Sequence, residues 1–168
     1  YFVTDRKPNL VLIAPMHKGS VVCPPQTCEM TYSRPQYIEE QSMPGLYRYR
    51  DGGVPDSTRH CSLVVLFLPG HAGDYRQVRS LGNEVLRAAN HEKFSAHVYA
   101  LTNNEAFSGF DGDLLRQHAV QTATTLNLLC ERYHVQPRLP AIVVVAHSMG
   151  GIAALEALRV LSSNGAST

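Results

Sequence analysis

Apolar and polar residues alternate in blocks from residue 61 onward. Residues 62–68 and 141–146 are continuous, apolar and rich in β-branched residues, as is typical of strands buried on both faces. Residues 94–101 are a third strand candidate. After each of them, apolar residues recur at helical spacing: 78–88, 113–133 and 152–161. This order predicts right-handed crossovers and a mainly parallel sheet with helices on both faces, a three-layer α/β/α fold.

The first part of the chain is harder to assign. Prolines are frequent in residues 1–45 and prevent long regular elements, so we expect an irregular N-terminal segment with one short strand at 10–14. Residues 46–168 are predicted to form the N-terminal portion of an incomplete α/β domain, which begins with an alternating strand at 46–50. Asp74 is predicted to cap the helix that follows strand 62–68, with Gln77 as its capping-box partner.

The segment from Ala146 to Gly151 lies between an apolar strand pattern and a helical pattern. Strand, tight turn and helix in this order, with a serine in the turn, are typical of a nucleophile elbow, which exposes the serine Oγ. The residues two before and two after the serine pass close to each other, and here they are the small Ala146 and Gly150. Ser148 is therefore the predicted nucleophile, and Ala146, Gly150 and Gly151 are expected to support the elbow.

Acyl transfer also needs donors for the oxyanion that develops at the carbonyl. In a strand–elbow–helix arrangement, one donor is the N–H of the residue after the nucleophile, which is Met149 here. The second comes from the loop after an earlier strand, where we expect the N–H of His71 first and of Ala72 second. Gly70 and Gly73 would let that loop approach the substrate.

The rest of a catalytic triad is missing after the serine. Hydrolases of this kind carry nucleophile, acid and histidine in that order, but only Glu156 and Arg159 are ionisable after Ser148. His147 is expected to point away from its neighbour and to serve as a shell residue. We therefore expect the acid and the histidine beyond residue 168, in a longer protein. The isolated chain should be inactive, and strand 141–146 should lie at an exposed sheet edge if the chain ends there.

The composition of the chain excludes some classes of protein. The chain has 168 residues, 44% hydrophobic and 17% charged, with a net charge of +1, which is typical of a globular domain and gives no basic stripe for nucleic acid. Cys23 and Cys28 could be oxidised in a secretory compartment, whereas Cys130 is expected to be a small buried apolar residue. The cysteine spacing matches no zinc pattern, and we expect neither a metal nor a cofactor.

Three segments resemble the glycosylphosphatidylinositol (GPI) inositol-deacylase family. Residues 28–32, with Pro35 and Tyr37, are similar to its C-x-M-x-Y-x-x-P-x-Y element. Residues 67–81 resemble its LPGNAGSYKQVRSL element, and residues 147–151 resemble its GHSMGG elbow. The resemblance covers residues 28 to 160 in the same order and at similar spacing. Two positions depart from the family pattern: His71 replaces an asparagine, and Ala146 replaces the first elbow glycine.

The resemblance implies an α/β-hydrolase fold and hydrolysis of the acyl ester on the inositol of GPI anchors, with Ser148 as nucleophile. It further implies a multi-pass protein of the endoplasmic reticulum membrane with a lumenal catalytic domain, membrane segments outside this chain, and a role in export of GPI-anchored proteins. A lumenal setting would favour a Cys23–Cys28 bridge. Two alternatives stay open: another lipase or esterase of the same fold, and a degenerate hydrolase-like binding module without catalysis.

Overall fold

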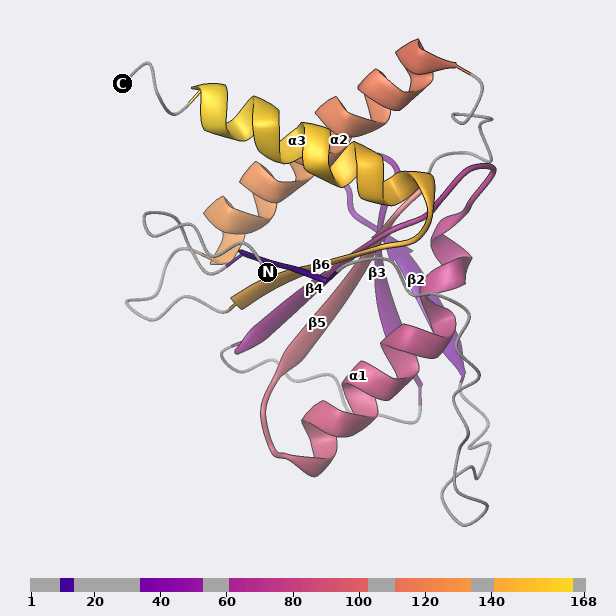
Figure 1. The fold of residues 1–168 in the computed structure, drawn as a ribbon. Coiled ribbons are helices and arrows are strands. Elements are labelled where there is room, and N and C mark those ends of the chain that lie inside the picture. The colour runs from indigo at the N-terminus through magenta and orange to yellow at the C-terminus, as the bar shows by residue number, and fades with distance from the viewer. Residues whose placement is uncertain (1–9, 14–33, 53–60, 103–110, 134–140, 165–168) are drawn as a thin grey trace.

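The computed structural model describes residues 10–13, 34–52, 61–102, 111–133 and 141–164, which are coloured in Figure 1. The strands are β1 (Leu10–Ile13), β2 (Pro35–Glu39), β3 (Leu46–Asp51), β4 (Leu63–Leu68), β5 (Ala96–Leu101) and β6 (Ala141–Ala146). The helices are the short 3₁₀-helix η1 (Tyr75–Val78), α1 (Arg79–His91), α2 (Gly112–Tyr133) and α3 (Met149–Asn164). The Cys23–Cys28 bridge and most of the first family-like element lie outside the described residues.

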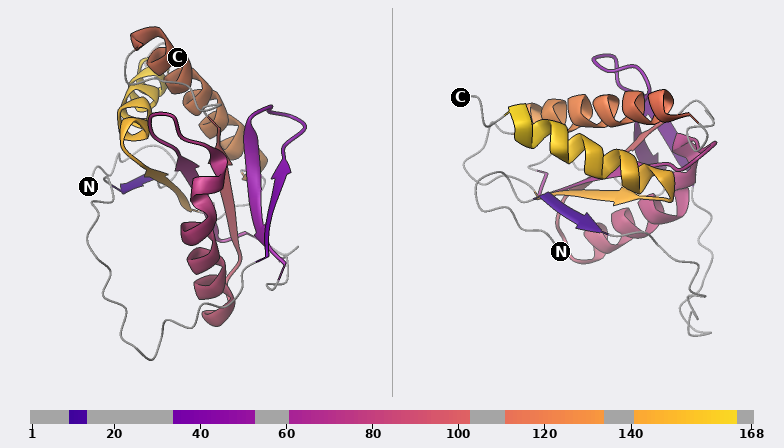
Figure 2. Two further views of the ribbon diagram at one scale, coloured as in Figure 1. Left: turned by 90° about the vertical axis from the view of Figure 1, so that its right-hand side faces the viewer. Right: turned by 45° about the horizontal axis from the view of Figure 1, so that its top comes forward.

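The six strands form one sheet in the order β1-β6-β4-β5-β3-β2. The first four of these are parallel, whereas β3 is antiparallel to β5 and to β2. Helix α1 covers one face of the sheet, and α2 and α3 cover the other (Figures 1 and 2). The predicted three-layer fold with a mainly parallel sheet, and the α/β-hydrolase architecture that the resemblance implies, are both confirmed.

Alternate residues of β4 enter two separate cores. Val64, Leu66 and Leu68 pack with α2 and α3 in one hydrophobic cluster. Val65 and Phe67 pack with α1 and the 3₁₀-helix in the other. All five side chains are buried, which explains why this strand is continuously apolar. Burying an aliphatic or aromatic side chain stabilises the fold by roughly 1.5–3 kcal/mol, so β4 is a rigid base for the loop that follows it.

The start of the helix after β4 differs from the prediction. Asp74 does cap the chain, but its carboxylate accepts from the Arg76 N–H, and the first helical turn is the 3₁₀-helix η1. The α-helix begins only at Arg79. Val78, Leu81 and Val85 of the predicted apolar pattern pack against the sheet, as expected. Ala88 is exposed, and Ala89 is buried in its place.

Two strands lie in the segment that was expected to be irregular. One is the predicted β1, and the other, β2, was missed because its sequence, PQYIE, has no clear apolar alternation and its hydrogen-bond partner is β3. Strand β1 also corrects the expected position of β6. It pairs in parallel with β6 from Leu10↔Ile142 to Ile13↔Val145. Strand β6 is therefore an interior strand between β1 and β4, and does not lie at an exposed edge.

Candidate functional site

The turn between β6 and α3 has the geometry of a nucleophile elbow. Ser148 is exposed and has a φ of 52°, in the left-handed region that residues with side chains rarely adopt. The His147 N–H donates to the Leu68 carbonyl (3.0 Å), and the Gly150 and Gly151 N–H groups donate to the carbonyls of His147 and Ser148 (2.9 Å each). These bonds fix the turn and over-determine the strained backbone at the serine.

Close packing explains two of the small residues at the elbow. A Cβ at Gly150 would lie 2.6 Å from the Pro69 carbonyl oxygen and 2.7 Å from that of Leu68. Ala146 is 4% exposed, at the end of β6. Gly151 differs from them, because a Cβ there would meet nothing within 4 Å. The expected supporting role of Gly151 therefore finds no steric reason in the described part of the chain.

The loop after β4 lies directly against the elbow. A Cβ at Gly70 would be 2.8 Å from the Ser148 Cβ and 2.9 Å from the His147 carbonyl oxygen. The Gly73 N–H donates to the Gly70 carbonyl (3.0 Å) and closes a turn. A Cβ at Gly73 would also be 2.7 Å from the Pro69 Cβ, so the turn accepts only glycine without a shift at either position. The structure thus brings the two predicted motifs together at the carboxyl ends of β4 and β6.

The predicted oxyanion donors lie on the two segments that meet here. Met149 is the first residue of α3, where N–H groups have no acceptor inside the helix and the helix dipole favours negative charge. Ala72 is exposed with a φ of 49°, and His71 beside it is half-buried. Backbone N–H groups on two adjoining turns can bind an anion between them, which is what acyl transfer at Ser148 would need.

A base is not part of this arrangement. Among the residues that the structure describes, no histidine or carboxylate is hydrogen-bonded to the Ser148 Oγ. The His147 ring is exposed and lies beside Gly70, where a Cβ would be 3.1 Å from its Nδ1. His118 is on α2, half-buried, and burial lowers its pKa below the ordinary value. His97 lies in a separate network near the amino end of β5.

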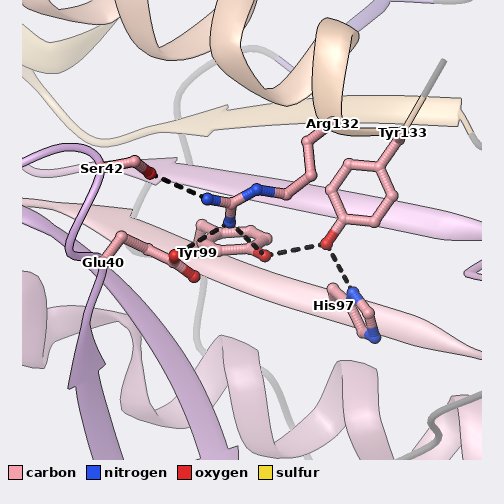
Figure 3. Close-up of polar contacts among 6 residues, drawn as sticks. All are labelled: Glu40, Ser42, His97, Tyr99, Arg132 and Tyr133. Carbon is pink, nitrogen blue, oxygen red and sulfur yellow. Dashed lines mark hydrogen bonds and ion pairs between the residues drawn. The ribbon is translucent and has the colours of Figure 1, made fainter.

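That network joins six residues and was not predicted from the sequence (Figure 3). Arg132 of α2 contacts Glu40 (2.9 Å) and donates to Ser42 (3.0 Å) and to the Tyr99 hydroxyl (3.4 Å). The Tyr99 and Tyr133 hydroxyls are 2.8 Å apart, and the Tyr133 hydroxyl is 2.5 Å from the His97 Nδ1. Burial raises the pKa of Tyr133 well above its usual value. The network fastens the β2–β3 connection and β5 to α2.

A cavity of about 310 Å³ lies away from the elbow, beyond the point where the β3–β5 ladder ends. Its lining includes Arg48, Arg50 and Asp51 of β3 and Ser95 and His97 at the amino end of β5. The elbow lies at the carboxyl ends of the parallel strands, whereas the cavity lies at the end of the sheet where these strands begin. It is not part of the predicted crevice.

The described residues contain neither a candidate metal site nor a candidate membrane span. No group of three His, Cys, Asp or Glu side chains in that part of the chain is arranged to hold a metal ion. None of the helices that the structure describes combines the length and the hydrophobicity needed to cross a membrane. Cys61 and Cys130 are half-buried and form no disulfide with a described residue, and both pack against the core on the α2 and α3 face.

Comparison with known protein families shows which family the chain belongs to. A family model described as the PGAP1-like alpha/beta domain matches residues 60–165, which include β4, α1, β5, α2, β6 and α3. The chain belongs to this family. The match contains the loop after β4 and the elbow, so both halves of the site lie in the family's own domain. The resemblance to GPI inositol-deacylases is confirmed by individual relatives as well.

Relatives named GPI inositol-deacylase occur in fungi and in animals. The protein from Phaeosphaeria nodorum is 31% identical over 157 residues, which cover 76% of this chain and 15% of the relative. The protein from Aspergillus oryzae is 35% identical over 166 residues, covering 84% of this chain and 15% of the relative. The protein from Drosophila melanogaster is 30% identical over 142 residues, covering 76% and 14%. The chain thus spans about 15% of the length of the first two of these relatives.

Proposed function

We propose that this chain carries the nucleophile and the oxyanion hole of a serine hydrolase that removes the acyl chain from the inositol of GPI anchors. The observation that carries the proposal is the exposed, left-handed Ser148 at the first turn of α3, packed against the glycine turn after β4. The proposed substrate is taken from the name of the relatives, GPI inositol-deacylase. By the family relationship, the setting would be the lumenal side of the endoplasmic reticulum membrane, with membrane anchoring by segments other than those described.

In the proposed reaction, the Ser148 Oγ attacks the carbonyl carbon of the acyl ester and transfers its proton to a base. The carbonyl oxygen becomes an oxyanion, which the N–H of Met149 and that of His71 or Ala72 stabilise. The intermediate collapses, the C–O bond to inositol breaks, and the inositol oxygen leaves with the proton. Water then gives a proton to the base and attacks the acyl-serine carbonyl; the bond to the Ser148 Oγ breaks, the Oγ takes up that proton, and the fatty acid is released. In this proposal the base and its acid partner come from outside the described residues.

The test uses Ser148→Ala in the complete reading frame, expressed in cells that lack their own inositol deacylase. An acylated inositol makes GPI-anchored proteins resistant to bacterial phosphatidylinositol-specific phospholipase C. With Ser148→Ala, reporter proteins should stay resistant, whereas Ser80→Ala, an exposed serine on α1, should restore sensitivity as the unmodified protein does. Normal sensitivity with Ser148→Ala would refute the proposed nucleophile.

Two alternatives differ from the proposed reaction in what the complete protein releases. The first is a hydrolase-like binding module without catalysis. A purified complete protein that binds acylated inositol lipid but releases no fatty acid would support this alternative. Release of fatty acid from triacylglycerol, with acylated inositol left intact, would instead indicate a lipase or esterase of the same fold.

A further inference from the structure

The loop formed by residues 69–74 is attached to the elbow at its first half. The His147 N–H donates to the carbonyl of Leu68, the last residue of β4 (3.0 Å), and Gly70 lies directly against Ser148. This attachment fixes Pro69 and Gly70. The residues that follow in the loop include the left-handed Ala72, and the bond from the Gly73 N–H to the Gly70 carbonyl (3.0 Å) holds them in a closed turn. The position of this turn relative to the elbow also depends on how its far end, at Asp74, is held.

The second half of the loop continues into η1 through Asp74. The Asp74 carboxylate accepts from the Arg76 N–H (2.9 Å), and its carbonyl accepts from the Gln77 N–H (3.1 Å). Between these residues lies Tyr75, the first residue of η1. A displacement of the Tyr75 backbone would therefore also displace Asp74 and the end of the turn that precedes it.

Tyr75 is held by tyrosines of the β2–β3 hairpin. Its ring stacks on Tyr47 of β3, with centroids 3.8 Å apart and an interplanar angle of 15°. Tyr37 of β2 packs edge-on against Tyr75 (5.1 Å) and against Tyr49 of β3 (5.6 Å). We call Tyr37, Tyr47, Tyr49 and Tyr75 the tyrosine cluster. Because aromatic pairs of this kind contribute beyond the area they bury, the cluster has a defined geometry.

Further contacts make the tyrosine cluster rigid. The Tyr37 hydroxyl donates to the Arg76 carbonyl (3.4 Å), and the Arg76 guanidinium lies 5.3 Å from the centre of the Tyr75 ring. On the other side, Tyr49 is 1% exposed and Gly82 of α1 lies against its ring, where a Cβ would be 2.5 Å from the Tyr49 Cδ1. The cluster is thus held between the sheet and α1.

From these contacts we propose that Tyr75 is a positioning residue for acyl transfer, which sets the N–H groups of residues 71 and 72 opposite the elbow. This inference rests on the proposed function. In the proposed reaction Tyr75 touches no reacting atom. It acts by fixing the end of the loop through the tyrosine cluster. A displacement of about 1 Å in a catalytic group can reduce the rate by up to about 100-fold, so the far end of the loop has to be held as well as the end at the elbow.

The experiment compares Tyr75→Leu with Tyr75→Phe in the complete protein, with release of fatty acid from acylated inositol lipid as the assay. Tyr75→Leu removes the stacked ring, and kcat should fall by about 10- to 100-fold with KM within about twofold, because the oxyanion exists only in the transition state. The affinity for an alkyl boronic acid, a mimic of the tetrahedral intermediate, should fall in parallel. Tyr75→Phe keeps the stacking with Tyr47 and should restore kcat.

Tyr133→Leu is the matched control, because it also removes a half-buried tyrosine but lies at the far end of α2. It should lower the melting temperature and leave kcat unchanged. Unchanged kcat in Tyr75→Leu, a loss confined to KM, or an equal kcat loss in Tyr133→Leu would overturn the inference. If Tyr75→Leu does not fold, Tyr47→Leu removes the stacking partner and gives the same comparison. Activity that survives Ser148→Ala would instead refute the proposed function itself.

Discussion

Two adjacent glycines at the start of α3 offer a measurement of how tightly the elbow is packed. Gly150 and Gly151 both lie in the first turn of α3, so replacement by alanine gives each a similar gain in helix propensity, up to about 1 kcal/mol. Their surroundings differ completely. A Cβ at Gly150 meets the carbonyl oxygens of Pro69 and Leu68 at 2.6 and 2.7 Å, whereas a Cβ at Gly151 meets nothing within 4 Å.

The expected difference follows from the kind of atom that is met. Carbonyl oxygens of the backbone cannot rotate away, so Gly150→Ala must move α3 relative to the end of β4. Overpacking of this kind costs about 1–3 kcal/mol. Because the propensity gain cancels between the two variants, Gly150→Ala should be less stable than Gly151→Ala by about 1–3 kcal/mol. Gly151→Ala itself should be as stable as the unmodified protein or slightly more stable.

Urea denaturation followed by circular dichroism measures this difference directly. The midpoint should fall for Gly150→Ala and stay or rise for Gly151→Ala, with the same slope in all three proteins. A change in the slope would mean that the denatured state had also changed, and the comparison would then use the melting temperature. Equal midpoints for the two variants would refute the packing of Gly150 against the end of β4.

Two further predictions concern the polar network on α2. Arg132→Ala should lower the free energy of unfolding by about 1–2 kcal/mol, because the half-buried pair with Glu40 and the bond to the Tyr99 hydroxyl are lost together. Urea titration measures this change, and an unchanged midpoint would argue against the network. Burial raises the pKa of Tyr133, so the unfolded chain loses this proton first, near pH 10, and the stability contributed by Tyr133 is complete below that pH and falls above it. Tyr133→Phe should be less stable than the unmodified protein by about 1 kcal/mol at pH 7. Only the unmodified protein loses stability through Tyr133 as the pH rises, so the difference between the two should shrink between pH 9.5 and 11 in melting experiments. A constant difference would contradict this.

Much of the fold follows from local pattern. The continuous apolar run of β4 predicts a strand buried on both faces, and the structure divides its side chains between two cores. The elbow was predicted because its requirement is local: a serine between an apolar strand and a helix, with small residues on either side. Its contact with the turn at Gly70 was expected from a general rule, since loops at the carboxyl ends of parallel strands share one edge.

Other features depend on which segments meet, and a single sequence does not contain that information. Strand β2 is defined by its partner β3, and the neighbour of β6 is the distant β1. The tyrosine cluster needs β3 to lie next to β5, which no spacing along the chain reveals. Tyr133 belongs to the apolar stripe that the helical pattern predicts, but nothing in that pattern shows that its hydroxyl meets Tyr99 and His97 of β5. The contacts of Arg132 with Glu40 and Ser42 likewise depend on the position of the β2–β3 connection.

The pairing of β1 with β6 also has a consequence for how the chain acquires its fold. Leu10 is synthesised long before its partner Ile142, and parallel pairing over such a separation requires a large loop closure. The other parallel ladders, β4 with β5 and β4 with β6, connect segments that are closer in sequence. We therefore expect β1 to dock last. Until it does, the outer edge of the strand that leads to Ser148 is open during synthesis, and this is the stage at which a chaperone would protect the nascent protein.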